Sequence, residues 1–140
     1  MRNLSKDLEI IDADTITAAG TGAVLSDAIE VGGARSVLGV VSIGIVVANG
    51  TNILTATECD TSGGSYTAIT GATTGTVTNS SNTQLILEVV APKKRYIKFT
   101  CTRAEANTTL DGMTAAVYGR KNRPITQGAT AAEAPTVVIG

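Results

Sequence analysis

The feature that most constrains this chain is a succession of short β-prone runs with a turn signal roughly every ten residues. Thr, Val, Ile and Gly are abundant, whereas Leu, Lys and Glu are sparse. This usage favours strands over helices. At 140 residues, one domain is the simplest organisation. We therefore predict an all-β fold: a single-domain β-sandwich or jelly-roll-like antiparallel barrel with extended N- and C-terminal segments.

The chain divides into three parts. We predict the sandwich domain over residues 8–118, between an N-terminal segment at residues 1–7 and a C-terminal arm at residues 119–140. The arm contains two prolines and shows no amphipathic period. Fully extended, it would span roughly 70 Å. It ends in the apolar, β-prone sequence PTVVIG, which favours docking on a neighbour.

Two local patterns in the first half are informative. Residues 35–47 are apolar at both alternating sets of positions, which predicts a strand covered on both faces. Asn49-Gly50 follows, and this dipeptide is typical of a type I′ turn. We therefore expect a hairpin that joins this strand to residues 52–59.

The most cationic run, PKKRYIKFTCTR at residues 92–103, raises the question of nucleic-acid binding. In a strand, Ile97, Phe99 and Cys101 point to the core, with Arg95 and Arg103 at the strand ends. Lys94 and Lys98 share the outer face, about 13 Å apart. A polynucleotide surface needs cations that converge on phosphates and exposed rings that stack on bases. We expect no nucleic-acid partner. A loop is predicted at residues 104–108, and a further strand at residues 109–118.

Charge is unevenly distributed although the net charge is −1. Residues 1–60 contain three cations and eight acids, and residues 93–123 contain eight cations and two acids. Such a dipolar chain suits head-to-tail association of copies, and pairing within one copy explains it equally well.

The sequence lacks the residues that several kinds of catalytic and metal-binding site require. The chain has no His, which removes Ser-His-Asp catalysis and imidazole metal sites. We interpret Cys59 and Cys101 as buried, unreactive thiols made in a reducing cytosol. Asp12 and Asp14 match a calcium loop only weakly, because the following Gly and the distal Glu are missing. We expect no enzyme activity, cofactor or metal. We also expect no signal peptide and no membrane span.

The second half resembles the head decoration, or cement, proteins of tailed bacteriophages. The likeness covers about residues 56–127 and rests on two stretches: ATECDTSGGSYTAIT at residues 56–70, and APKKRYIKFTCTRAEANTTLDGMTAAVYGRKNRPITQG at residues 91–128. It implies a non-enzymatic virion protein, made in the host cytoplasm, that binds the capsid exterior. The partners it implies are the major capsid protein and further copies of itself, as a homotrimer at local three-fold positions.

The resemblance also suggests contact residues. Capsid contact is expected from the N-terminal segment and the C-terminal arm, and Leu38, Val40 and Val46 are a second candidate set for contacts between copies. The candidate capsid- or subunit-contact cations are Arg2, Lys6, Lys94, Lys98, Arg120, Lys121 and Arg123. Two alternatives remain open: a carbohydrate-binding β-sandwich module, and another non-enzymatic head or tail component of a virion.

Overall fold

The computed structural model describes residues 7–121, and every element between residues 8 and 118 is a strand. The predicted all-β fold is confirmed. Arg2, Lys6, Arg123 and most of the predicted arm lie outside the described residues. The strands are β1 (Leu8–Asp14), β2 (Thr17–Leu25), β3 (Ile29–Glu30), β4 (Ser36–Val46), β5 (Thr51–Cys59), β6 (Thr67–Thr73), β7 (Val77–Thr78), β8 (Thr83–Val90) and β9 (Tyr96–Tyr118).

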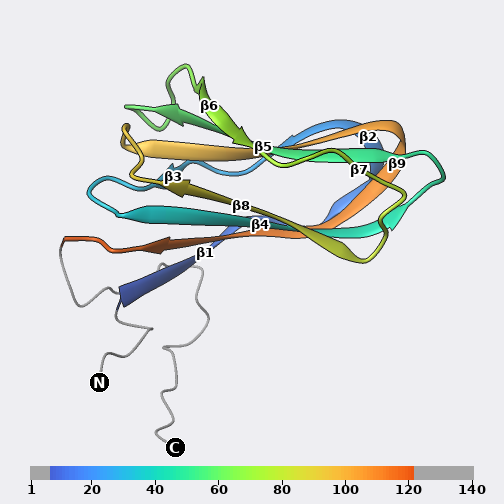
Figure 1. The fold of residues 1–140 in the computed structure, drawn as a ribbon, viewed down its shortest axis with the longest axis horizontal. Coiled ribbons are helices and arrows are strands. Elements are labelled where there is room, and N and C mark those ends of the chain that lie inside the picture. The colour runs from blue at the N-terminus through green and yellow to red at the C-terminus, as the bar shows by residue number, and fades with distance from the viewer. Residues whose placement is uncertain (1–6, 122–140) are drawn as a thin grey trace, which may run out of the picture.

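The 23-residue strand β9 organises the whole sheet (Figure 1). Its first half pairs with β5 on one edge and with β2 and β3 on the other. Its second half pairs with β4 and β1. The hydrogen-bonded order is β6-β5-β9-β4-β8, and every pairing is antiparallel. One strand therefore belongs to two parts of the sheet, which we call its layers: the first half of β9 with β2, β3 and β5, and its second half with β1, β4 and β8.

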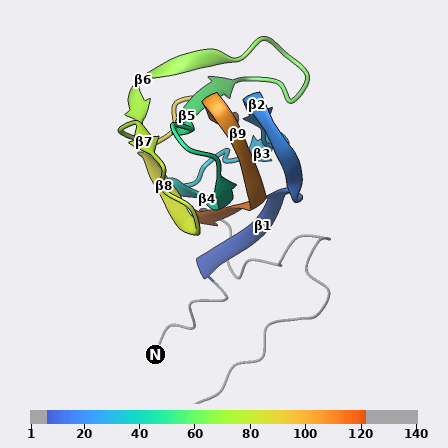
Figure 2. The ribbon, with the colours of Figure 1, turned by 90° about the vertical axis from the view of Figure 1, so that its right-hand side faces the viewer.

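The two layers form because β9 bends instead of ending. The loop predicted at residues 104–108 is wrong, since the strand runs through this segment. The bend coincides with Glu105, whose φ is 67°, a left-handed value uncommon for a residue with a side chain. Register shifts in the β2 and β4 pairings fall beside the same segment. Viewed end on, the strands curve around a common interior as a nearly closed barrel (Figure 2).

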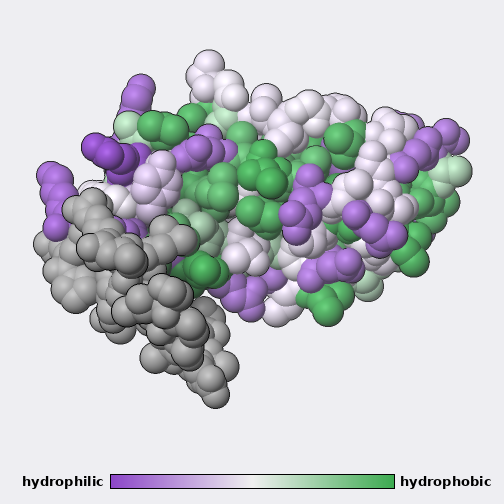
Figure 3. All heavy atoms as spheres, turned by 60° about the horizontal axis from the view of Figure 1, so that its bottom comes forward, coloured by the Kyte–Doolittle hydropathy of each residue, from purple (hydrophilic) through white to green (hydrophobic). Residues whose placement is uncertain are grey.

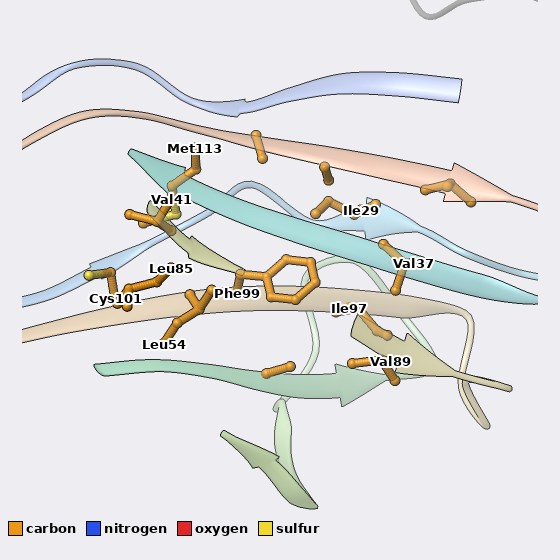
Figure 4. Close-up of a cluster of buried hydrophobic side chains, with 14 of the residues drawn as sticks. Ile29, Val37, Val41, Leu54, Leu85, Val89, Ile97, Phe99, Cys101 and Met113 are labelled. Carbon is orange, nitrogen blue, oxygen red and sulfur yellow. The ribbon is translucent and has the colours of Figure 1, made fainter. Parts of the chain in front are cut away.

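Alternation in β9 places the core as predicted. Ile97, Phe99 and Cys101 are buried, and so are Met113, Ala115 and Val117 after the bend. Phe99 projects into the middle of the cluster, between side chains from the facing strands (Figure 4). Branched aliphatic residues supply most of the rest of this core, as expected for strands whose inner faces interdigitate.

The hairpin predicted at Asn49-Gly50 is wrong, and the turn that forms is centred one residue earlier, on Ala48 and Asn49. Asn49 has a φ of 71°, and the Gly50 amide donates to the carbonyl of Val47 at 2.8 Å. However, β4 pairs with β8 and β9, whereas β5 pairs with β6, β7 and β9. Both edges of each strand are thus taken by other partners. The turn carries the chain from one layer to the other.

The strand at residues 35–47 is covered on one face only. Val37, Val41 and Ile43 are buried inward, while Leu38 and Val40 on the outer face are half-buried. The prediction of two covered faces is therefore confirmed for the inner face and is wrong for the outer face in a single copy of the chain.

Candidate functional site

The cations predicted around the start of β9 are engaged inside the molecule. The Lys94 ammonium lies 4.0 Å from a carboxylate oxygen of Asp60. The Lys98 ammonium lies 4.9 Å from the centre of the Tyr66 ring, within the range of a cation–π contact. Both side chains therefore have partners in the connection between β5 and β6, and they do not converge on one point.

Arg95 is held in the same way. It forms a two-nitrogen contact with one carboxylate oxygen of Glu30, at 2.9 and 2.8 Å. Its guanidinium carbon also lies 5.4 Å from the centre of the Tyr96 ring. Lys94, Arg95 and Lys98, three cations of the most cationic segment, thus each have a local acidic or aromatic partner.

Arg120 joins chain segments that are far apart in the sequence through an ion pair and a hydrogen bond. Its guanidinium lies 2.8 Å from Glu9 Oε2, and the two side chains are only 19% and 17% exposed. It also donates to the carbonyl of Glu30 at 2.6 Å. Arg120 therefore ties the end of β9 to β1 and β3. Lys121, the next candidate, is exposed.

Arg103 is the polar residue that sequence reasoning misplaced. It is 7% exposed, and its guanidinium donates to three backbone carbonyls: Thr108 at 2.7 Å, Ala18 at 2.9 Å and Gly22 at 3.3 Å. The alternation of β9 already puts Arg103 on the face of Ile97, Phe99 and Cys101. The sequence predicted that the strand ends at Arg103, and a residue at a strand end is expected to be exposed. Because β9 continues past this position, Arg103 is buried instead.

Two further buried polar side chains lie near this bend. Asn52 on β5 is the register partner of Arg103, and it is 1% exposed. Thr108 is fully buried, and its carbonyl accepts from Arg103. Neither side chain has a hydrogen-bond partner within the described structure. Both could bind small polar molecules such as water.

The two cysteines match the sequence interpretation. Both are free and buried. Burial raises the pKa of the Cys101 thiol to about 11, an effect that the nearby Arg103 charge partly opposes. Because the thiolate is the nucleophilic form, Cys101 is held unreactive near neutral pH.

An acidic hollow of about 450 Å³ lies beside the second half of β9. Its lining includes the carboxylates of Asp12, Asp14 and Asp111, together with Ser42 and Thr114. Within residues 7–121, no group of three His, Cys, Asp or Glu side chains is placed to hold a metal ion. The hollow is a local concentration of negative charge.

An apolar surface lies next to this hollow. We call it the β4 face, and it comprises outward-facing residues of β4, β8 and β9: Leu38, Val40, Ile86, Val90, Ala116 and Tyr118. Ile86 is 55% exposed, Val90 66% and Tyr118 36%. Figure 3, which brings the lower side of Figure 1 forward, shows apolar residues gathered in the middle of that side. Surfaces of this kind mark interaction sites.

Comparison with known proteins extends the description of the fold. No protein-family model matches the sequence, and no curated protein matches it. Similar solved structures include YomS, derived from the SPBc2 prophage, with a TM-score of 0.49 and 13% identity over 80% of this chain and 95% of YomS. The N-terminal CBM22-1–GH10 modules of Clostridium thermocellum xylanase 10B, complexed with xylohexaose, give 0.48 and 14% over 84% and 29%.

The PBSX exported protein XepA gives a TM-score of 0.51 at 17% identity. The match covers 100% of this chain and 45% of XepA, so the chain spans less than half of that protein's length. This likeness shows a shared β fold. The structural neighbours thus include phage-derived proteins.

Among residues 7–121, no helix has the length and apolar character of a membrane span.

Proposed function

We propose that this chain is a non-enzymatic structural protein of a phage virion that binds the outside of the capsid and stabilises contacts between major capsid subunits. The observation that carries the proposal is the β fold shared with the phage-derived XepA. The likeness of residues 56–127 to decoration proteins supports the finer role.

The surface chemistry of the described residues agrees with this role. Its notable features are engaged ion pairs, an apolar sheet face and an acidic hollow. Cys101 is buried with a raised pKa, so it offers no nucleophile at neutral pH. These features suit contact with protein neighbours better than chemistry on a small substrate.

The structure refines which cations can contact a capsid. Arg120 is bound to Glu9 and to the Glu30 carbonyl, so its removal would disturb the fold as well as any contact. Lys121 is exposed, and Arg123 follows two residues later in the sequence. We therefore propose Lys121 and Arg123 as the capsid-contacting cations of this segment.

The test is co-sedimentation with intact, DNA-filled heads over a range of salt concentrations. Lys121→Ala/Arg123→Ala should bind heads more weakly, by about tenfold for a loss of roughly 1.4 kcal/mol. Its binding should also depend less on salt, because exposed charge pairs are screened. Lys94→Ala/Lys98→Ala removes the same charge and should bind like the parent chain, since both lysines are engaged locally.

The outcomes separate two levels of the proposal. A parent chain that does not bind heads at all would reject the capsid role. Full binding by Lys121→Ala/Arg123→Ala, with unchanged salt dependence, would reject only the assignment of the contact residues. Binding to tails but not to heads would favour the alternative of another virion component.

For the carbohydrate-binding alternative, the described part of the chain offers one open aromatic ring, that of Tyr118, which is 36% exposed. Sugar binding commonly uses open aromatic faces for apolar stacking. The rings of Tyr66 and Tyr96 each have a cation over them. The trimer implied by the resemblance stays a prediction, and the sedimentation experiment below tests it against a different assembly.

A further inference from the structure

The β4 face changes in character along its strands. Its middle is apolar and consists of Leu38 and Val40 on β4, Ile86 on β8 and Ala116 on β9, which the register places side by side. A single copy leaves Ile86 more than half exposed. An exposed, contiguous apolar patch on a sheet face is costly in water unless another surface covers it.

One end of the face is acidic. At the row of Ser42 and Gly112, the face meets the hollow that contains Asp12, Asp14 and Asp111. The lining of this hollow includes no Lys or Arg. Asp111 is exposed, and its carboxylate lies over Gly44, close to where a Cβ atom would stand.

The opposite end is basic. Arg35 and Lys93 are exposed, and they lie where β4 begins and just after β8 ends. The Arg35 amide donates to the Tyr118 carbonyl at 3.0 Å, and the Arg35 carbonyl accepts from Ala91 at 2.8 Å. Three acids also lie near this end: Glu9 and Glu30 are paired with Arg120 and Arg95, and Asp7 has an interaction of its own.

We propose that the β4 face is the contact between two copies of this chain, packed face to face with their strands antiparallel. The two-fold axis lies in the contact plane, perpendicular to the strands. This operation lays apolar middle on apolar middle and the acidic end of each copy on the basic end of the other. A face with this gradient is self-complementary, as an isologous contact requires.

The spacing along β4 supports this arrangement. The apolar middle is centred on Gly39, between Leu38 and Val40, and this centre lies four residues after Arg35, which is about 13 Å along β4. The same distance beyond this centre leads to Ile43, whose pairing partner on β9 is Leu110, next to Asp111. The proposed operation therefore brings the start of β4 in one copy, which Arg35 precedes, near the row of Leu110 and Asp111 in the other. Parallel packing would instead place the acidic ends together.

Glu88 is the one carboxylate inside the apolar part of the face, opposite Leu38 in the register. It accepts hydrogen bonds from the Ser36 hydroxyl and the Tyr118 hydroxyl of its own copy, and these bonds lower its pKa. Covering the face therefore does not leave this carboxylate without hydrogen-bond donors.

The first test is sedimentation equilibrium of the full chain from about 1 to 100 µM, where a dimer is expected. Ile86→Arg should raise the dimer dissociation constant about 100-fold or more, because it buries an unpaired charge. Leu25→Arg is the matched control. Leu25 is 54% exposed, against 55% for Ile86, but it lies on β2, outside the β4 face. It should leave the dimer intact. Thermal unfolding of each variant checks that the fold is retained.

The second test is a charge exchange. Arg35→Glu and Asp111→Lys should each weaken the dimer about tenfold, and the double variant should recover to within about threefold of the parent. Recovery identifies the antiparallel arrangement, because only there does each reversed residue meet the other.

Three results would overturn the proposal: a monomer throughout the concentration range, a stable trimer, or a dimer unaffected by Ile86→Arg. A parent monomer that dimerises once residues 122–140 are removed would also overturn it, by assigning the face to the chain's own C-terminal segment. None of these measurements uses heads, so they stand or fall independently of the capsid role.

Discussion

At the scale of single residues, Arg103 shows how one buried charge can hold a bend. It lies just before the left-handed residue Glu105 and donates to carbonyls of β2 and of the β9 segment beyond the bend. These carbonyls lie where the register between β2 and β9 shifts. The guanidinium, with its fork of donors, therefore binds backbone on both sides of the bend.

Replacing Arg103 with Met should therefore destabilise the fold. The change keeps much of the apolar stem but removes the donor to the buried Thr108 carbonyl and to the part-buried carbonyls of Ala18 and Gly22. A buried group left without a partner costs about 1–3 kcal/mol. We expect the free energy of unfolding to fall by about 3 kcal/mol. Urea denaturation followed by far-UV circular dichroism measures it.

Arg95→Met is the matched control for this prediction. Arg95 lies next to β9 but is exposed, and its bonds go to the exposed Glu30. Its loss should be much smaller, because exposed ion pairs contribute little. Equal losses in the free energy of unfolding for the two substitutions would show that the hydrogen bonds of Arg103 do not stabilise the bend.

At the scale of elements, β4 and β9 are joined by a close contact across the interior. Gly39 lies beneath the Phe99 ring, and a Cβ atom there would stand 2.6 Å from a ring carbon. The one Phe of the chain can fill the middle of the core because β4 has no side chain at this position. The glycine inside this apolar strand is thus a packing requirement.

Gly39→Ala should destabilise the protein by about 1–3 kcal/mol, the usual cost of overpacking a filled core. Gly75→Ala is the control, because no atom lies within 4 Å of the added Cβ, and it should change stability by no more than about 0.5 kcal/mol. Chemical denaturation of both variants gives the values.

The contact between Gly39 and Phe99 can be tested further with the substitution Phe99→Leu. If the ring causes the clash, Gly39→Ala should cost less in the Phe99→Leu background than in the parent. Strict additivity of the two substitutions would contradict the proposed contact.

At the scale of the whole molecule, cooperativity depends on β9. It pairs along both edges with strands of both layers, whereas β6 stands at one end of the strand order. Opening β9 would break both layers at once. Opening β6 breaks only its pairing with β5.

Native-state hydrogen exchange should therefore show a clear order. Amides of Ile97, Phe99 and Val117 should exchange only through global unfolding, about 100-fold or more slowly than those of Ile69 and Thr70 in β6. Exchange measured by NMR at several denaturant concentrations distinguishes the two routes. Independent exchange of the two halves of β9 would show that the layers unfold separately.

The sequence alone determined the features that depend on local periodicity. Alternation identified the inward residues Ile97, Phe99, Cys101, Met113, Ala115 and Val117, because side-chain direction repeats every two residues in any strand. The all-β class and the turn at Asn49 were predicted for similarly local reasons, from composition and from tolerance of positive φ.

Only the tertiary structure decided which strands are neighbours. The hairpin at Asn49-Gly50 and the loop at residues 104–108 were wrong because pairing depends on which distant edges are available, and no local pattern carries that information. The same holds for the cations. Lys94, Lys98 and Arg120 lie beside Asp60, Tyr66 and Glu9 because the fold brings segments that are distant in sequence together. Long-range pairing also assembled the β4 face, whose residues come from three strands far apart in the sequence.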